Sequence, residues 1–455
     1  MPSSAPLTER TAIFTQGSIA RHVLTLLVTS ALSLLAVFLV DILTLAYVAS
    51  LEDQALLATV GLAKTLMFLN GALVSGIVIA AGALLSERIG KHARKRLARL
   101  VSHLLVMAAV APALVAGFEF LSWRVLSRWF PALGDIDQLS LPFIVMTLAA
   151  CVPMALAQMC AQLLKAKGCP RLALAVLLAG TLTLAAADPL LMFGLNMGLQ
   201  GAGLSCLVSA AVSAGVGLAC VRRHLGVSAK FHFRLFRLHA GRTAQIGVPA
   251  MLGNLAMPVG ITYLMLTLAA QGTSVLAGMA VIDRILQLGY CLYFALPAAL
   301  VPIIAQNLGA GRDDRAWQAI SFTGKSVVLY GVLLWLALAL LGPWIAGYFQ
   351  LSGAGRDMLL AFTRFGAGLW ILFGLDFLAQ SMFLTTGKAW WVPFFGWLRG
   401  TAGTLPFVYL GGHWAAGTGA LVGMWLGNAA VALIAIVTGV VTTRAFFSRR
   451  AAGLH

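Results

Sequence analysis

The stretch IARHVLTLLVTSALSLLAVFLVDILTLAYV, residues 19–48, determines how the rest of the chain is interpreted. A transmembrane α-helix needs about 20 consecutive apolar residues, so this stretch is long enough to cross a bilayer with some tilt. Between Arg21 and Glu52 it carries a single formal charge, Asp41. A carboxylate at the bilayer centre costs roughly 2.5–3.5 kcal/mol on insertion scales. We therefore expect Asp41 either to serve a function or to pair with a neighbouring cation.

The composition of the whole chain is that of a polytopic membrane protein. Of the 455 residues, 60% are hydrophobic and 10% are charged, whereas about 25% of the residues of a soluble domain are charged. A net charge of +17 in a soluble protein would suggest a nucleic-acid partner. In a membrane protein the excess of Lys and Arg in cytoplasmic loops explains the charge better. We expect the lipid bilayer as a partner and no nucleic acid.

Twelve apolar segments are long enough to cross a bilayer as helices. They cover approximately residues 19–48, 55–85, 100–122, 139–165, 172–195, 201–221, 243–270, 274–305, 320–348, 358–386, 392–411 and 417–443. The sequence therefore predicts an all-α polytopic membrane protein with twelve transmembrane helices.

The Lys and Arg residues between these segments alternate between a rich side and a poor side. Of the 31 basic residues, 24 fall on the rich side, four on the poor side and three inside the segments. The rich side includes the 88–99 cluster and both chain ends. Because cytoplasmic loops carry the excess of positive charge, we expect a multi-pass protein of the cell inner membrane with both termini cytoplasmic.

A weak internal repeat relates the two halves of the chain at a constant offset in the numbering. The stretch LLSERIGKHARKRLA (84–98) aligns without a gap on IIAQNLGAGRDDRAW (303–317), which places Gly90 on Gly309. Farther along, Gly168 falls on Gly387 at the same offset. Six helices per copy give parallel repeats related by an axis along the membrane normal, and secondary transporters built in this way often carry substrate between the halves.

The repeat divides the chain into three parts. We expect an N-terminal six-helix lobe at 1–221, a basic cytoplasmic linker at 222–242 and a C-terminal six-helix lobe at 243–455. The two lobes are expected to be pseudo-symmetric.

No complete nucleotide-binding or hydrolase motif occurs in the sequence. Gly324, Lys325 and Ser326 match the end of a Walker A motif, but Ala319 stands where its first glycine belongs. The H-E-x-x-H and G-x-S-x-G motifs are also absent. We expect no enzyme activity, no cofactor and neither catalytic nor metal-ligating residues. A proton or sodium gradient would then drive any uphill transport.

Ionisable residues inside the apolar segments are the candidate functional sites. Asp41 and Asp188 lie at a similar predicted depth, so the two can share one cavity. Two carboxylates in a poorly hydrated cavity favour retention of a proton by one of them, which suits proton coupling. Lys64 reaches a similar depth in the next segment and either pairs with Asp41 or exchanges partners with it.

Further positions in the apolar segments have open roles. Pro189 follows Asp188 directly and is expected to loosen its helix. Asp283 and Arg284 point about 100° apart on one helix, so each is expected to meet a different helix in a structural role or in contact with substrate. Asp376 is a candidate cation site in the second half, and Arg399 also lies inside an apolar segment.

The chain resembles the multidrug and toxic compound extrusion (MATE) family along essentially its whole length. The stretches that carry the resemblance are Gly17-Ser18-Ile19, LEDQALLATVGLA at 51–63, Asp188-Pro189-Leu190, Gly247-Val248-Pro249 and AQNLGAGR at 305–312. The last of them is the most specific.

The resemblance implies twelve helices in two V-shaped six-helix lobes and the export of organic, often cationic or amphipathic, compounds in exchange for protons or sodium. The coupling acids of the family match Asp41 and Asp188. Members of the NorM-like branch carry a Glu in their seventh helix, whereas no acid occurs here from Phe231 to Ala280. This difference favours the proton-coupled, DinF-like branch. Asp376 roughly matches another NorM-like acid, so sodium coupling stays open.

The leading hypothesis is a monomeric antiporter that exports drug-like small molecules in exchange for protons by alternating access. One alternative is a sodium-coupled exporter of the same fold, and another is a lipid-linked saccharide flippase. A flippase should contain a large cavity lined by several arginines, whereas the basic residues within the membrane here are Lys64, Arg284 and Arg399. An enzyme or a channel is disfavoured because neither clustered catalytic residues nor a ring motif is visible.

Overall fold

The computed structural model of the protein describes residues 12–50, 54–92, 97–129, 131–228 and 231–452. Within these ranges the chain is almost entirely helical, which confirms the predicted all-α class. Ten of the described helices are long and apolar enough to cross a bilayer. Part of the 88–99 basic cluster, Arg94, Lys95 and Arg96, lies outside the described residues.

The chain forms two compact units that largely follow the two halves of the sequence. Each unit also contains one short segment from the other half. Unit 1 contains Met1–Gly17, Leu32–Val248 and Ala305–Ala310. Unit 2 contains Ser18–Ala31, Pro249–Ile304 and Gly311–His455. The first turns of the first helix therefore belong to unit 2, and a short piece of the second half belongs to unit 1.

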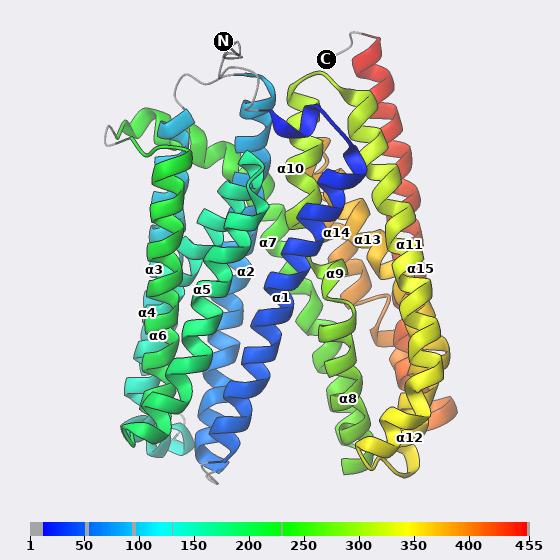
Figure 1. Cartoon of the computed structure of the whole chain (residues 1–455). Helices are drawn as coiled ribbons and strands as arrows, with labels where there is room; N and C mark the ends of the chain where they lie inside the picture. Colours follow the sequence, from blue (N-terminus) through cyan, green and yellow to red (C-terminus); the bar gives the residue numbers. More distant parts are fainter. Residues whose placement is uncertain (1–11, 51–53, 93–96, 130, 229–230, 453–455) are drawn as a thin grey trace, which may run out of the picture. The chain divides into compact units, whose positions relative to one another are not determined.

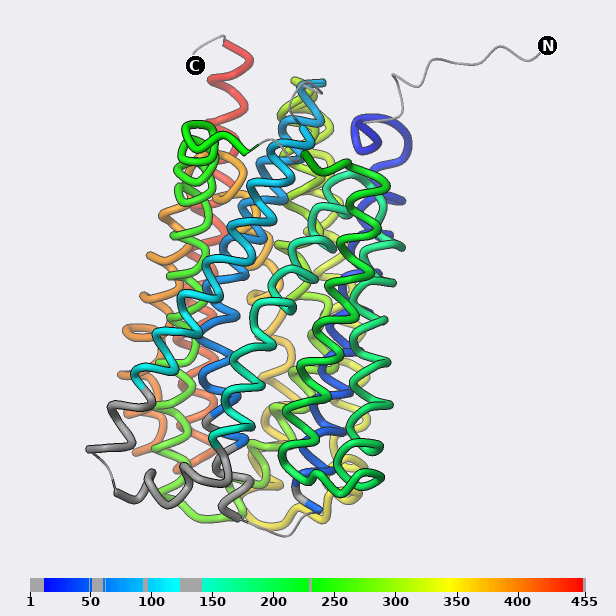
Figure 2. Tube along the Cα trace, turned by 90° about the vertical axis from the view of Figure 1, so that its left-hand side faces the viewer, coloured from blue at the N-terminus to red at the C-terminus, as the bar shows by residue number. Residues whose placement is uncertain are grey.

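Unit 1 is a bundle of long helices with short connections (Figures 1 and 2). Its elements are η1 (Ile13–Thr15), most of α1 (Ile19–Ala49), α2 (Gln54–Gly90), α3 (Leu97–Trp129), α4 (Pro131–Lys167), α5 (Pro170–Pro189), η2 (Leu190–Gly194), α6 (Gly198–His224) and the first turns of α7 (Phe233–Ala269). Helix α4 is central, because it packs against α2, α3, α5 and α6.

Small residues allow α5 and α6 to approach closely. A Cβ atom added to Gly180 would lie 2.8 Å from Ser213 Cβ. Ser213 in turn donates its hydroxyl to the Val176 carbonyl at 2.7 Å. In a bilayer, where lipid tails are as apolar as leucine, such close packing and interhelical hydrogen bonds hold helices together.

Unit 2 is built around α13. Its elements are the first turns of α1, the rest of α7 from Pro249 on, α8 (Thr273–Gly289), α9 (Cys291–Phe294), most of α10 (Leu296–Gly309), α11 (Asp313–Tyr348), α12 (Gly353–Ala361), η3 (Phe362–Gly366), α13 (Ala367–Thr385), α14 (Trp391–Gly400) and α15 (Leu405–Ala451). Helix α13 packs against α11 and α15, and α12 packs against α8.

The stretch labelled α15 is a pair of antiparallel helices. Ala415 and Ala416 have non-helical backbone angles, at which the chain turns back. A Cβ added to Gly411 would lie 2.1 Å from the Gly419 carbonyl oxygen, so glycine is required for this close backbone approach. The turn falls between the predicted segments 392–411 and 417–443.

The two stretches that align in the sequence repeat also pack against each other within unit 1. A Cβ on Gly90 would lie 2.1 Å from the Gln306 carbonyl oxygen, and a Cβ on Gly309 would lie 2.3 Å from the Glu87 carbonyl oxygen. The repeat aligns Glu87 with Gln306 and Gly90 with Gly309. The contact is therefore reciprocal between positions that the repeat aligns.

Polar side chains of the exchanged segment Ala305–Ala310 hold the 3-10 turn η1. The Phe14 backbone N–H donates to Gln306 Oε1 at 2.7 Å. Asn307 Nδ2 donates to the Phe14 carbonyl at 3.3 Å, and Gln306 Nε2 donates to the Ala166 carbonyl at 3.4 Å. The stretch that carries the most specific part of the resemblance thus links η1 to the end of α4.

The backbone conformation repeats at the same offset. Gly168 and Gly387 both have positive φ angles, 90° and 75°, and both follow the end of a long helix, α4 and α13. His92 and Gly311, which the repeat also aligns, have φ angles of 51° and 71°. These left-handed residues terminate corresponding helices in the two copies.

Candidate functional site

Unit 1 contains a cavity of about 410 Å³. This volume lies within the roughly 300–1,000 Å³ of small-molecule pockets. Polar residues on α1, α2, α4 and α5 form part of its lining: Asp41, Thr44, Lys64, Thr147, Gln158 and Thr181. Much of the remaining lining is apolar and includes Met67, Phe68, Phe143 and Met154. The cavity therefore has room and apolar surface for an organic molecule, with a few polar groups to orient it.

Asp41 and Lys64 reach this cavity from two different helices. Asp41 lies on α1 and Lys64 on α2, and both are solvent-exposed residues of unit 1 that line the same cavity. The two residues, which are predicted to lie at a similar depth, therefore share one cavity. A site that presents one carboxylate and one ammonium group can bind partners of either charge.

Asp188 is buried beside this lining, with 1% of its surface exposed. Its carboxylate accepts hydrogen bonds from the Thr44 and Ser205 hydroxyls. Thr44 lies one turn from Asp41 on α1 and itself lines the cavity. Asp188 thus meets the cavity wall through Thr44, while Asp41 faces the cavity directly.

The helix that carries Asp188 changes its geometry at this point. Helix α5 ends at Pro189 and continues as the π-helical turn η2, in which the Leu195 N–H donates to the Leu190 carbonyl at 2.9 Å. Proline has no N–H and cannot continue the α-helical ladder. π-Turns inside helices are frequent at functional sites. The expected loosening of the helix at Pro189 is seen here as a π-turn.

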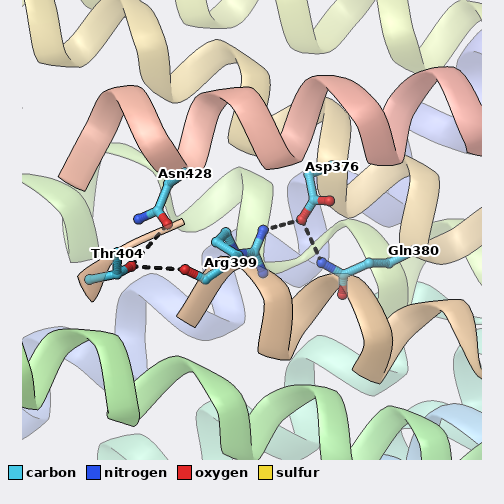
Figure 3. A network of polar contacts seen from close by, with 5 residues as sticks. All are labelled: Asp376, Gln380, Arg399, Thr404 and Asn428. Atoms are coloured by element: carbon cyan, nitrogen blue, oxygen red, sulfur yellow. Dashed lines mark hydrogen bonds and ion pairs between the residues drawn. The ribbon is translucent and has the colours of Figure 1, made fainter. Parts of the chain in front are cut away.

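Unit 2 holds its own buried carboxylate, Asp376, in a different environment (Figure 3). Asp376 is 2% exposed and forms an ion pair with Arg399 of α14. Gln380 Nε2 donates to the same carboxylate oxygen, Oδ2, at 2.9 Å. The Arg399 guanidinium also lies 5.6 Å from the centroid of the Phe373 ring. The carboxylate proposed as a cation site is thus bound to an arginine of its own unit.

A threonine connects this ion pair to α15. The Thr404 hydroxyl contacts the Arg399 carbonyl at 2.9 Å and Asn428 Oδ1 at 3.1 Å (Figure 3). The Thr404 hydroxyl therefore anchors the link between α14 and α15 to Arg399, the residue that pairs with Asp376.

Asp283 and Arg284 are both half-buried on α8. Arg284 Nη1 donates to Gln287 Oε1 at 2.9 Å. We expected each of these charged residues to meet a different helix, but this hydrogen bond of Arg284 stays on α8. Residues three apart are neighbours on a helix surface, and the long arginine side chain reaches that partner without leaving the helix.

The sequence analysis missed a further buried carboxyl group, Glu119 on α3. It is 6% exposed, and both of its carboxylate oxygens are buried. The Asn70 side chain of α2 lies beside it and donates to the Pro112 carbonyl at 3.0 Å. Among the residues whose side chains the structure describes, no Lys or Arg forms an ion pair with Glu119. Glu119 is also an acid inside a predicted apolar segment, so the criterion that selected Asp41 applies to it as well.

The long apolar helices and the cavity between them fit a membrane transporter. The family model named MatE matches the chain twice, over residues 29–190 and 249–410, and the chain belongs to this family. The second match follows the first at close to the offset of the sequence repeat. The predicted MATE resemblance is confirmed. The family and the fold are those of transporters and not of enzymes.

Curated relatives include proteins named as transporters. A protein from Pseudomonas savastanoi, described as an uncharacterized 21 kDa protein, is 34% identical over 54% of this chain and 80% of its own length. The FAD transporter of Shewanella oneidensis is 32% identical over 36% of this chain and 37% of its own length. The multidrug export protein MepA of Staphylococcus aureus is 22% identical over 76% of this chain and 77% of its own length.

Solved structures show the same fold. A structure of the MATE transporter VcmN of Vibrio cholerae has a TM-score of 0.86 at 19% identity and covers 94% of this chain and 98% of its own. At this identity the likeness establishes the architecture, and function has to be argued from the site.

Proposed function

We propose that this protein exports organic, cationic or amphipathic small molecules in exchange for protons, with Asp41 as the coupling carboxylate. The supporting observation is the 410 Å³ cavity of unit 1, in which Asp41 and Thr44 form part of the lining and Asp188 accepts a hydrogen bond from Thr44. A carboxylate that faces a cavity can exchange a proton or bind a cationic substrate. A carboxylate buried behind the wall can sense that exchange through the threonine.

The coupling follows from the cost of burying charge. Protonation of Asp41 removes the cost of closing the cavity around a carboxylate. It therefore shifts the population between outward-open and inward-open states, by no more than the difference in proton affinity between the two states. Substrate and proton would then compete for the same carboxylate, which produces exchange.

Two observations favour protons over sodium and the DinF-like branch over the NorM-like branch. No acid occurs from Phe231 to Ala280. The buried acid of unit 2, Asp376, is bound to Arg399 and Gln380. Hard cations such as sodium prefer several oxygen ligands, and an arginine competes with the cation for the same carboxylate.

A second candidate substrate class is an anionic flavin nucleotide. It is favoured by Lys64, which brings an ammonium group into the same cavity, and one relative is named an FAD transporter. A lipid-linked saccharide flippase is less favoured, because the cavity lining that is described contains Lys64 and no arginine.

The proposed topology has twelve crossings in two pseudo-symmetric six-helix lobes. The ten long apolar spans include one continuous stretch, Trp391–Ala451, which turns back at Ala415 and Ala416 and counts as two crossings. The short helices α8–α10 together form the twelfth. With the basic residues on the cytoplasmic side, both termini are cytoplasmic, and the protein is a monomer in the inner membrane.

The test is export of a fluorescent cationic dye from whole cells under an imposed pH gradient or an imposed sodium gradient. The wild type is compared with Asp41→Asn, and with Asp314→Asn as the control that removes an exposed carboxylate of α11. We expect export by the wild type and by the control under the pH gradient alone. Export by Asp41→Asn should fall to background at equal expression.

Two results would overturn the proposal. Undiminished export by Asp41→Asn would show that this carboxylate is not the coupling group. Export driven by sodium alone would show that the coupling ion is wrong. Flavin nucleotide export that requires Lys64 while dye export is absent would establish the second candidate instead.

A further inference from the structure

A second cavity lies in unit 1 where α2 ends, on the basic side of the sequence. It has a volume of about 220 Å³, and its charged and ionisable lining consists of Glu87, Arg88, Lys91, His239 and Arg242. The end of α2 and the first turns of α7, which are far apart in the sequence, supply these residues. None of these residues has a role in the proposed transport site, which is lined by different residues.

The cavity carries an excess of positive charge. Three cations and one carboxylate leave a net charge of +2 around it. The carboxylate, Glu87, is paired with Lys91 one turn further along α2. Arg88 and Arg242 add two further positive charges to the lining, whose net positive charge attracts an anion.

A pair of histidines orients Arg88 in this cavity. Arg88 Nη2 lies 3.4 Å from His239 Nε2, and His239 Nδ1 lies 2.8 Å from His103 Nδ1. A guanidinium is a donor only, so His239 Nε2 accepts and its Nδ1 carries the proton that is donated to His103. Both rings are then neutral, and the positive charge of the site is contributed by its Arg and Lys side chains.

The segment next to the cavity has the composition of a membrane surface helix. Phe231, Phe233 and Leu238 are 50%, 72% and 50% exposed, and Arg234 and Arg237 alternate with them. Apolar and basic side chains in this pattern place a helix at the boundary between headgroups and acyl chains. The Phe231 ring also packs edge-on against the His103 ring, with 5.1 Å between the ring centroids. His103 contacts His239 of the cavity lining, which connects this segment to the cavity.

We propose that this cavity binds a phosphate group, either in the headgroup of an anionic phospholipid or as a free phosphate. Arginine forks match phosphate oxygens, and basic pockets between membrane helices bind anionic headgroups. The volume of 220 Å³ is below the roughly 300–1,000 Å³ of drug-sized pockets, so it suits a phosphate group better than a whole organic substrate. This site is independent of the proposed transport reaction.

The test is thermal unfolding of the full chain, purified in detergent, with three added probes. They are phosphatidylglycerol, phosphatidylcholine and inorganic phosphate at constant ionic strength. Arg242→Gln and Lys91→Gln remove exposed cations of the cavity, so these variants should fold. Arg223→Gln, which removes an exposed cation at the end of α6 outside the cavity lining, is the matched control.

We expect phosphatidylglycerol to raise the melting temperature of the wild type and of Arg223→Gln at the same concentration. Arg242→Gln should need about tenfold more of the lipid, since one charge-assisted contact to phosphate is lost. If inorganic phosphate gives the same variant-sensitive shift, the phosphate group alone is the ligand. If it gives none, the ligand is the lipid headgroup.

The proposal is wrong if Arg223→Gln and Arg242→Gln lose the response equally, because a diffuse surface charge would then account for it. It is also wrong if phosphatidylcholine stabilises every variant as well as phosphatidylglycerol does. A melting temperature that none of the probes changes would overturn it as well.

Discussion

The two units each bury an aspartate inside a helix, but they give it different partners. In unit 1, Asp188 accepts hydrogen bonds from the neutral hydroxyls of Thr44 and Ser205. In unit 2, Asp376 is paired with the permanently charged Arg399. Neutral hydroxyls can donate to a carboxylate and can also rotate to accept from a carboxylic acid. An arginine can only donate, so it is the partner of a carboxylate and cannot accept from a carboxylic acid.

Under the proposed function, this difference gives the two units different roles. A carboxylate with hydroxyl partners next to a cavity is the one we expect to take part in the proposed proton exchange. A carboxylate paired with arginine ties α13 to α14. Sequence position alone would have treated the two acids as equivalent, because each is an aspartate inside an apolar segment. Their different partners are the reason why we expect only one of them to take part in the proposed proton exchange.

The largest effect is expected when the arginine of unit 2 is removed. Arg399→Gln leaves Asp376 buried without its cation, and breaking a buried ion pair from one side costs about 3–5 kcal/mol. Thermal unfolding in detergent measures the loss. Arg364→Gln, an exposed arginine of the same unit, should change the stability by less than about 0.5 kcal/mol.

The double variant Arg399→Gln with Asp376→Asn sharpens this test. It removes both charges and should recover most of the stability lost by the single variant, since no unpaired charge then stays buried. A double variant as unstable as Arg399→Gln would show that packing of the arginine, and not its charge, stabilises unit 2.

Unit 1 should lose less stability than unit 2 when its buried acid is neutralised. Asp188→Asn keeps the shape of the side chain, and the hydroxyls of Thr44 and Ser205 can reorient toward the amide. We expect a loss of about 1.5–3 kcal/mol in stability, the size of a hydrogen bond to a charged group, together with loss of pH-driven export. Unfolding and dye export measured on the same preparation separate the two effects. Full export by Asp188→Asn would show that the buried acid of unit 1 is not needed for export, and the proposed difference in role between the two acids would be wrong.

The chemistry of these sites could be predicted from the sequence only in part. An acid inside a run of apolar residues is expensive, so Asp41, Asp188 and Asp376 were recognisable as special without a structure. The repeat offset also aligned Gly90 with Gly309, which pack against reciprocal backbone atoms in the fold. These signals are local, or depend only on distance along the chain.

The partners of the acids could not be predicted, because they depend on how helices rotate about their axes. Ser205 was one of many small residues in its segment, and Arg399 was noted as an intramembrane charge without being linked to Asp376. Glu119 was overlooked near the end of its segment. The exchange of Ala305–Ala310 into unit 1 is likewise a result of packing that no local pattern encodes.

The next prediction tests whether the exchanged segment Ala305–Ala310 is part of unit 1. Gly90→Ala would place a methyl group 2.1 Å from the Gln306 carbonyl oxygen, so the contact must open. Overpacking of this kind costs about 1–3 kcal/mol. Gly71→Ala on the same helix meets nothing within 4 Å and should be neutral or slightly stabilising. Equal unfolding temperatures for the two variants would contradict the packing of this segment on α2.

The smallest effect is expected at Glu119, a third buried carboxyl group that has neither hydroxyl partners nor an arginine among the described contacts. Because an isolated buried charge is costly, we expect Glu119 to be the neutral acid. Glu119→Gln has nearly the same shape as that acid, so its stability should stay within about 1 kcal/mol of the wild type. Thermal unfolding of the variant checks this. A loss as large as that of Arg399→Gln would mean that Glu119 is held ionised, and unit 1 would then contain a fixed charge of the kind that the comparison assigns to unit 2.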